Sequence, residues 1–249
     1  VPLMVDNTFA TPILCKPFEL GANIVVHSTS KYMDGHAVAL GGIIVDGGNF
    51  NWDNGKFPDL VEPDESYHGV SYLKQFGEAA YITKARVQVM SNFGMTTSPF
   101  NAWLTNLGCE SLHLRMRQHS DNALKIAKYL HDNEMCAWVK YPGLDDNKYY
   151  ELAKKYLPNG CSGVMTFGVK GGRDASRKFI NALKMVALVT HVADARTCVL
   201  QPASTTHRQL SDAELVACGI SPDMIRLSVG IEDADDIIAD FEQAFAQCK

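Results

Sequence analysis

Short apolar runs, several of them β-branched, alternate along this chain with longer stretches of helical periodicity. Residues 24–26 (IVV) and 42–45 (GIIV) are such runs, and turn-forming residues 46–48 (DGG) close the second. This alternation is typical of an α/β fold, and continuous apolar runs favour strands covered on both faces. Val1–Asp6 indicates another buried strand. Because the chain opens inside that strand without Met, we expect that residues are missing upstream.

The second half of the chain continues the same alternation. A long helix is predicted over residues 111–131, where apolar residues recur at helical spacing. Residues 225–231 alternate between apolar and polar positions like a strand, and a final amphipathic helix begins near Asp233. Further strand-like segments are residues 164–169 and 187–189. We predict two units, the C-terminal part of a large domain over residues 1–118 and a smaller α/β domain over residues 119–249.

Size and charge narrow the classes of protein that the chain can represent. At 249 residues it can form one large or two medium domains with a proper core. Its net charge of -5 argues against a nucleic-acid-binding protein, since such proteins usually carry a basic stripe. No apolar run is long enough to cross a membrane, and no signal peptide is visible. The scattered cysteines contain no CxxC pair, which disfavours a zinc site and favours a reducing, cytoplasmic setting.

Residues 49–75 interrupt the alternation. They are polar, aromatic and rich in Gly, Pro and Asp, so we expect a long surface excursion. Loops of this length are more often functional than idle. Within it, Tyr67 and His68 either border a site or form a surface or subunit contact.

A lysine preceded by three hydroxyl residues follows the apolar run of residues 24–26. The segment reads HSTSKY from His27 to Tyr32, and its lysine is Lys31. Open α/β sheets bind ligands beyond the carboxyl ends of their strands. There, hydroxyls can bind a phosphate, and a lysine amine can form a Schiff base with an aldehyde. Asp6 ends a neighbouring run in the same way, and its carboxylate can pair with a protonated pyridine nitrogen. These residues alone leave an ordinary solvated lysine as the commoner interpretation, because short motifs are weak.

Several motifs, in order, resemble those of one enzyme family. They are DNTFATP at residues 6–12, HSTSKY at residues 27–32 and GH at residues 35–36. Together they resemble the signature of the pyridoxal-phosphate (PLP) enzymes of Cys/Met metabolism, and the resemblance covers essentially the whole chain. It implies a type I PLP-dependent transferase fold, like that of aspartate aminotransferase, and a tetrameric assembly. The usual pattern has Thr directly before the lysine, whereas this chain has Ser30, which keeps the hydroxyl.

The resemblance assigns roles position by position. Lys31 would carry the cofactor covalently, and Asp6 would pair with its pyridine nitrogen. Ser28 and Ser30 would bind its phosphate, whereas His27 is better interpreted as a packed histidine at a strand end. Family members also carry upstream elements that this chain does not show, including a glycine-rich phosphate loop and a tyrosine that stacks on the pyridine ring.

An arginine lies on the polar side of the last predicted strand. From the residues alone, a structural salt bridge or a ligand carboxylate would satisfy Arg226 equally well. Residues 226–233 (RLSVGIED) resemble the family segment whose arginine clamps the substrate α-carboxylate, a role suited to a bidentate fork. Residues 194–207 resemble a second carboxylate-binding segment, with Thr197 where a serine is usual, so we expect Thr197 to bind substrate chiefly through its backbone. His207 either orients this loop or is a buried structural histidine.

The residues after Val45 indicate a branch of the family. GGNFNW at residues 47–52, YHGVSY at residues 67–72 and YPGL at residues 141–144 resemble the O-acetylhomoserine sulfhydrylase branch. The implied reaction in methionine biosynthesis replaces the acetate of O-acetyl-L-homoserine by sulfide and gives L-homocysteine; methanethiol would give methionine. Alternatives are a C–S lyase of the methionine γ-lyase or cystathionine lyase type, and a non-catalytic fragment that retains the fold.

Overall fold

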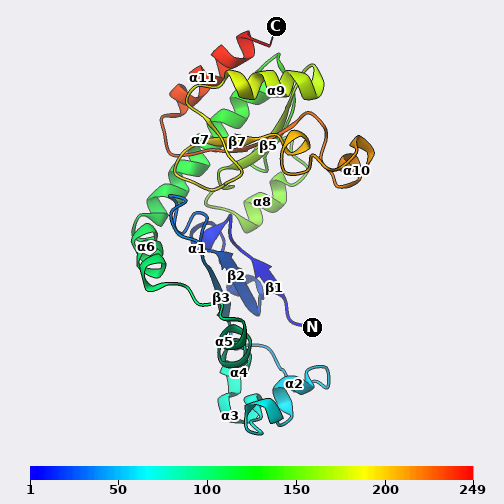
Figure 1. Ribbon diagram of the computed structural model, residues 1–249. Coiled ribbons are helices and arrows are strands. Elements are labelled where there is room, and N and C mark those ends of the chain that lie inside the picture. The colour runs from blue at the N-terminus through cyan, green and yellow to red at the C-terminus, as the bar shows by residue number, and fades with distance from the viewer. Residues whose placement is uncertain (249) are drawn as a thin grey trace.

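The computed structural model describes residues 1–248 and consists of two α/β units joined by a long helix (Figure 1). The N-terminal unit contains a three-stranded sheet in the order β1-β2-β3. β1 runs parallel to β2 and β3 runs antiparallel to it, so β1 and β2 end at the same edge of the sheet. The elements of this sheet and its connections are β1 (Met4–Asp6), α1 (Thr11–Leu14), the 3-10 helix η1 (Pro17–Leu20), β2 (Ile24–Ser28) and β3 (Gly42–Asp46).

The segment expected as a surface excursion folds into short helices around a small core that also includes Ile24 of β2. Trp52, Leu60 and Tyr72 are buried in it, and the Trp52 ring stacks on Tyr81 with centroids 5.3 Å apart. The expected excursion is thus built from short helices, because aromatic residues scattered among polar ones gather into one cluster. The helices are α2 (Pro58–Val61), η2 (Glu65–Tyr67), α3 (Tyr72–Phe76), η3 (Gly77–Ala79) and α4 (Ala80–Lys84).

Two consecutive helices connect the units. The hydroxyl of Ser98 accepts a hydrogen bond from the Asn101 N–H and so caps the first of them, which the sequence analysis missed. The second confirms the long helix expected over residues 111–131. These two helices are α6 (Pro99–Glu110) and α7 (Leu112–Asp132), and the π-helical η4 (Ala85–Met90) and α5 (Ser91–Phe93) precede them.

The C-terminal unit contains a mixed sheet in the order β4-β5-β8-β7-β6. Ile225, Leu227 and Val229 are fully buried as predicted, whereas Ile231 is exposed; Ser228, which ends the strand on the opposite face, is buried as well. Asp233 caps the last helix as expected. The elements are β4 (Cys136–Lys140), α8 (Tyr150–Tyr156), β5 (Val164–Val169), α9 (Gly172–Ala182), β6 (Ala187–Leu188), β7 (Cys198–Leu200), η5 (Pro202–Ser204), α10 (Asp212–Ala217), β8 (Met224–Ser228) and α11 (Ala234–Ala246).

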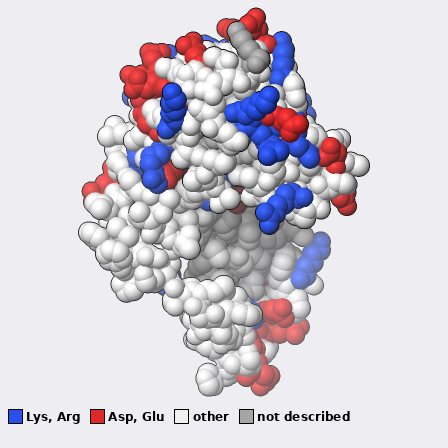
Figure 2. Space-filling model, turned by 45° about the horizontal axis from the view of Figure 1, so that its top comes forward, with Lys and Arg blue, Asp and Glu red and all other residues white. Residues whose placement is uncertain are grey.

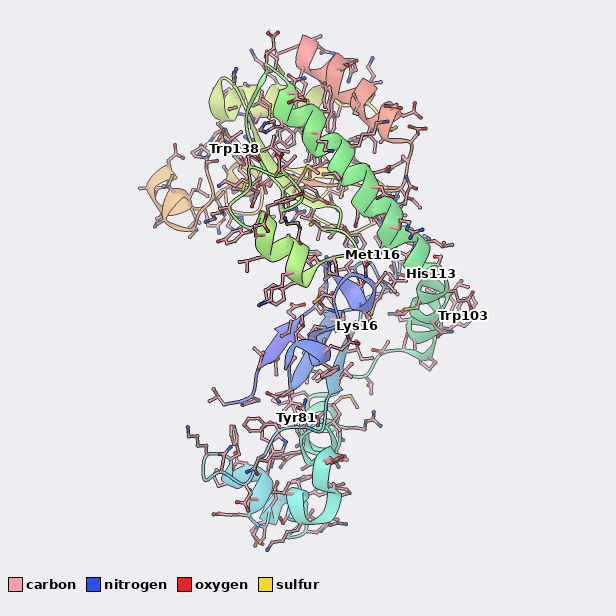
Figure 3. All side chains as sticks on the ribbon, turned by 180° about the vertical axis from the view of Figure 1, so that it is seen from behind. Lys16, Tyr81, Trp103, His113, Met116 and Trp138 are labelled. Atoms are coloured by element: carbon pink, nitrogen blue, oxygen red, sulfur yellow. The ribbon has the colours of Figure 1, made fainter. Side chains whose placement is uncertain are left out.

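Helix α7 passes from one hydrophobic core to another. Near its beginning, Leu112 and Met116 pack with Tyr32 of the N-terminal unit, and Figure 3 shows Met116 where the helix passes that unit. From Ala123 onward the helix packs into the core of the C-terminal unit. The packing partners change between these positions, which supports a division near residue 118. That division remains a proposal, since it falls inside one continuous helix.

The N-terminal sheet is more exposed than the apolar runs predict. Ile24 and Val25 of the central strand β2 are buried, as expected. Met4 of β1 and Ile43 and Ile44 of β3 are exposed, so coverage on both faces is wrong for the two outer strands within residues 1–248. In the same described part of the chain, every helix is too short or too polar to span a bilayer.

Candidate active site

A cleft of about 720 Å³ opens where β1 and β2 end, between the two units. Its N-terminal wall includes Asp6, Ser28 and Lys31, and its opposite wall includes Pro142 and Ser162. In Figure 1 the ends of β1 and β2 face α8, which belongs to the C-terminal unit. The structure thus brings together three of the residues that the sequence predicts as cofactor ligands.

A second groove of about 740 Å³ lies over β3 and carries mainly apolar side chains. His27 is the one residue of the predicted motif in its lining within the described chain. The His27 side chain is buried, its Nδ1 has no hydrogen-bond partner, and burial lowers its pKa. We place the active site in the first cleft, because that cleft gathers a lysine, a carboxylate and a hydroxyl.

The carboxylate of Asp6 is oriented by the residue two positions later. Its Oδ1 accepts hydrogen bonds from the Thr8 N–H, at 3.0 Å, and from the Thr8 hydroxyl, at 2.5 Å. The same hydroxyl oxygen accepts from the N–H of Ser28 at 2.9 Å and so joins the ends of the two strands. Oδ2 of Asp6 makes no hydrogen bond within residues 1–248 and stays available to a ligand. Thr8 was not predicted as a site residue, although its spacing from Asp6 is a signal for this turn.

Lys31 lies half-buried in the turn that follows β2. Its N–H donates to the Ser28 carbonyl at 3.3 Å, whereas its Nζ has no hydrogen-bond partner among residues 1–248. Burial lowers the pKa of this amine, and the positive charge of Arg226 lowers it further. A lysine with a lowered pKa is the form that can act as a nucleophile or a base near neutral pH.

The two serines of the motif have different surroundings. Ser28 lines the cleft, and its hydroxyl has no partner in the described chain. Ser30 is buried; its hydroxyl donates to the Gly41 carbonyl at 3.3 Å and accepts from the Gly41 N–H at 3.0 Å. The geometry therefore favours Ser28 as a phosphate ligand, while Ser30 ties the lysine turn to the start of β3.

Arg226 is half-buried on β8 without a carboxylate partner. No ion pair includes it within residues 1–248. Its Nη2 donates to the carbonyls of Thr190, at 2.9 Å, and His191, at 3.0 Å, whereas its Nε is buried and unpaired. Burial lowers the pKa of this guanidinium. Arg226 thus forms no structural salt bridge. A bound anion would supply the counter-charge that the fold does not provide.

Thr197 does not face the cleft. It is 1% exposed, and its hydroxyl donates to Glu232 at 2.8 Å and accepts from the Gly230 N–H at 2.8 Å. Its own N–H also donates to Glu232, at 2.6 Å. Neither its hydroxyl nor its N–H is free, so the geometry does not support the predicted substrate contact. Thr197 instead stabilises its loop through Glu232 and Gly230.

The other predicted candidates lie outside the cleft. Tyr67 stacks on Tyr72 in the helical excursion, and the neighbouring His68 is exposed. The Nδ1 of His207 lies 2.9 Å from the Thr206 hydroxyl. None of these side chains lines the candidate active site.

The unpaired groups fit PLP and an amino-acid substrate. The cleft offers an amine on Lys31, a carboxylate oxygen on Asp6 and a hydroxyl on Ser28. Arg226 does not line this cleft, but its positive charge is near enough to lower the pKa of Lys31. An amine for an aldehyde, a carboxylate for a pyridinium and a hydroxyl for a phosphate are the groups that this cofactor requires.

Comparison with known proteins agrees with this chemistry. The model of one family, the Cys/Met metabolism PLP-dependent enzymes, matches residues 1–246. The chain is 47% identical to an O-acetyl-L-homoserine sulfhydrylase of Leptospira meyeri, over 98% of this chain and 57% of that protein. It is also 47% identical to a homocysteine synthase of Schizosaccharomyces pombe, over 98% of this chain and 58% of the relative. The chain thus spans slightly under three fifths of the length of these relatives.

A solved structure extends the similarity to three dimensions. It belongs to Campylobacter jejuni, is described as an O-acetylhomoserine (thiol)-lyase and holds a pyridoxyl-lysine monophosphate group. The two structures agree with a TM-score of 0.92 at 36% sequence identity, over 98% of this chain and 58% of that one. The similarity therefore covers the whole described fold.

Proposed function

This chain belongs to the Cys/Met-metabolism family of PLP-dependent enzymes, and on that premise we propose that its protein is an O-acetylhomoserine sulfhydrylase. Its cofactor is PLP, and its fold is the type I PLP-dependent transferase fold. The observation that carries the proposal is the unpaired Lys31 amine, which shares one cleft with Asp6 and Ser28. The names of these two relatives favour sulfhydrylation over a lyase reaction.

Three residues would hold the cofactor. Lys31 would bind it covalently, Asp6 would keep its pyridine nitrogen protonated through the free Oδ2, and Ser28 would donate its hydroxyl to the phosphate. When bound, PLP supplies an electron sink for charge that develops on the amino-acid substrate. Thr8 would hold the Asp6 carboxylate in place, since both of its donors are directed at Oδ1. Ser30, which was also expected to bind the phosphate, would do so only after exchanging its partner Gly41.

Lys31 and Arg226 would act on the substrate. The guanidinium would bind the α-carboxylate through the donors that the loop carbonyls do not use. The Lys31 amine, once released by the substrate amine, would take up one proton from the substrate Cα and one from Cβ in turn, and would return one proton to each carbon after sulfide has replaced acetate at Cγ. The lowered pKa of Lys31 favours this exchange, because the neutral amine is the form that accepts a proton.

The overall reaction conserves electrons. The bond between Cγ and the acetate oxygen breaks, a bond between Cγ and the sulfide sulfur forms, and the thiol proton balances the departing acetate. O-acetyl-L-homoserine and hydrogen sulfide thus give L-homocysteine and acetic acid, without an oxidant or reductant. Methanethiol in place of sulfide would give methionine.

One assay separates this function from its alternatives. The purified protein, after incubation with PLP, is given O-acetyl-L-homoserine and sulfide, and homocysteine is measured; in parallel, 2-oxobutyrate release from methionine is measured. We expect homocysteine as the dominant product, together with the visible absorbance of lysine-bound PLP. Dominant 2-oxobutyrate would indicate a C–S lyase. The absence of both products and of the absorbance would indicate a non-catalytic fragment.

We also propose a homotetramer. Phe100, Trp103 and Leu107 form an exposed apolar stripe on α6, and residues 91–109 contain no charged side chain. Trp103 lies on the outer side of this helix in Figure 3. The face of the molecule shown in Figure 2 carries a broad uncharged area beside its charged part. Apolar patches of this kind mark interfaces between proteins. Sedimentation of the purified protein tests the proposal, and a monomer at micromolar concentration would contradict it.

A cytoplasmic location completes the proposal. All seven cysteines are free thiols in the structure, and disulfides are rare in reducing compartments. The substrates are small molecules, and the net charge of -5 gives no reason to propose a nucleic-acid partner. Fractionation of cells that express the tagged protein would test the location.

A further inference from the structure

A second arginine lies buried close to the lysine turn and forms no salt bridge. Arg115 belongs to α7 and is 5% exposed, and no ion pair includes it within residues 1–248. The charge of the buried Asp34 acts on Arg115 without forming an ion pair, so the hydrogen bonds of this guanidinium all go to backbone carbonyls and a hydroxyl. Arg115 has no part in the chemistry proposed above, which makes its partners informative.

The guanidinium of Arg115 binds the backbone directly after Lys31. Its Nη1 donates to the Tyr32 carbonyl at 2.8 Å, and its Nη2 reaches the Met33 carbonyl at 3.5 Å. Nη2 also donates to the carbonyl of Gly108, at 2.7 Å, at the end of α6. Nε donates to the Ser111 hydroxyl at 3.0 Å, between the two connecting helices. One side chain therefore joins the lysine turn to the junction of α6 and α7.

Two glycines let the backbone close around this guanidinium. A Cβ at Gly35 would overlap the Nη1 of Arg115, and a Cβ at Gly108 would overlap the carbonyl of Asp34. The turn is tightened further by its own hydrogen bonds, from Asp34 N–H to the Thr29 carbonyl at 2.9 Å and from Gly35 N–H to the Lys31 carbonyl at 2.7 Å. Neither glycine can therefore carry a side chain without displacing Arg115 or the backbone of residues 33–34.

We propose that Arg115 is a positioning residue for Lys31, an inference that rests on the proposed function of that lysine. Arg115 contacts neither substrate nor cofactor; it acts by holding the two carbonyls that follow the lysine. Fixing those carbonyls fixes the orientation of the Lys31 backbone. The flexible Lys31 side chain then extends from a Cα in a defined position at the edge of the cleft. Proton transfer at the substrate depends on such placement, because reacting atoms must approach within hydrogen-bond reach.

The first experiment compares the full-length, PLP-loaded protein with its Arg115→Met and Arg115→Lys variants. We expect kcat of Arg115→Met to fall about 10- to 100-fold, since misplacement by about 1 Å can have that effect, while KM changes far less. Arg115→Lys keeps the charge but loses the planar fork, so its kcat should lie between those of Arg115→Met and the wild type. Millimolar methylguanidinium should partly restore Arg115→Met by filling the vacated space.

The matched control is Arg117→Met, on the same helix. Arg117 is exposed and has no partner in the described chain, so its replacement should leave kcat and the absorbance of bound PLP unchanged. An unchanged kcat in folded Arg115→Met protein would overturn the proposal. The proposal would also be overturned if Arg115→Met and Arg117→Met lost kcat equally and methylguanidinium did not restore it. If Arg115→Met does not fold, the same outcomes are judged on Arg115→Lys.

Amide hydrogen exchange gives a readout that does not depend on turnover. The N–H groups of Asp34 and Gly35 should exchange at least about tenfold faster in Arg115→Lys than in the wild type, because the turn loses its anchor. Equal exchange in the two proteins would contradict the positioning role. If the wild-type protein makes no homocysteine but exchange is still faster in Arg115→Lys, the proposed function is refuted. The hold of Arg115 on the turn would then still stand.

Discussion

The hydroxyl oxygen of Tyr32 accepts a hydrogen bond from the N–H of Gly163, 3.0 Å away. Tyr32 directly follows Lys31 in the N-terminal unit, and Gly163 directly precedes β5 in the C-terminal unit. The same oxygen accepts from the Ser162 hydroxyl at 3.3 Å. Burial raises the pKa of Tyr32 to about 12, so the phenol stays protonated under physiological conditions. The lysine turn is thus bound directly to the wall of the cleft that faces it.

Replacing Tyr32 by Phe removes this acceptor and leaves two buried donors unpaired. We expect the free energy of unfolding to fall by about 1–3 kcal/mol, the cost of unsatisfied buried groups. Urea unfolding followed by circular dichroism measures the change. Tyr149→Phe, at an exposed tyrosine, is the control and should be neutral. A Tyr32→Phe variant as stable as the wild type would show that the hydrogen bonds contribute nothing net.

Replacing Lys31 by Ala should abolish both the visible absorbance of bound PLP and turnover, because the proposed covalent attachment and the mobile proton are lost together. Absorbance scans and the homocysteine assay measure the two effects. Lys16→Ala is the matched control, since Lys16 is an exposed lysine of the same unit, paired with Glu19 (Figure 3). If Lys31→Ala keeps the absorbance and the turnover, the cofactor role of this lysine is wrong.

Replacing Arg226 by Lys tests the carboxylate site. We expect KM for O-acetyl-L-homoserine to rise about 10- to 100-fold, because lysine cannot form a bidentate pair. The effect on kcat should be smaller, since carboxylate binding is made in both ground and transition states. Arg177→Lys, on the exposed face of α9, should change neither constant. An unchanged KM in Arg226→Lys would assign the carboxylate to other groups.

The stability of the protein should depend on pH through His119. This side chain is fully buried, its Nδ1 donates to the Val229 carbonyl at 2.7 Å, and its Nε2 has no partner among residues 1–248. Burial lowers the pKa of His119 from 6.5 to about 4. Between these values the unfolded chain binds a proton that the native protein does not. The contribution of His119 to the free energy of unfolding is therefore complete above pH 6.5. It falls by up to about 3 kcal/mol as the pH decreases towards 4.

Unfolding at pH 7 and at pH 5 measures this effect. The loss of stability between the two should be smaller in His119→Gln, which cannot titrate, than in the wild type. His113→Gln is the control, because His113 is exposed on the same helix (Figure 3) and should leave the difference unchanged. Equal losses in His119→Gln and the wild type would assign the acid sensitivity to other groups.

Local patterns in the sequence predicted the elements that depend on neighbouring residues. The alternation at Ile225, Leu227 and Val229 placed a buried strand correctly, and Asp233 marked the start of the last helix. The excursion was predicted less well. Its small core joins Trp52 to Tyr81, which no period of 2 or 3.6 reveals.

The sequence by itself determined the α/β fold and the position of Lys31 after a strand, because strand periodicity, capping and the strand-end motif are local. Only the tertiary structure decided which side chains remain free to bind a ligand. Ser30 is turned to Gly41, and Thr197 is bound by Glu232, so neither hydroxyl is available. Arg115 reaches the lysine turn from far along the chain. These partners depend on packing between segments that are distant in the sequence. A buried polar group without a hydrogen bond is costly, so it pairs with whichever group the fold places beside it.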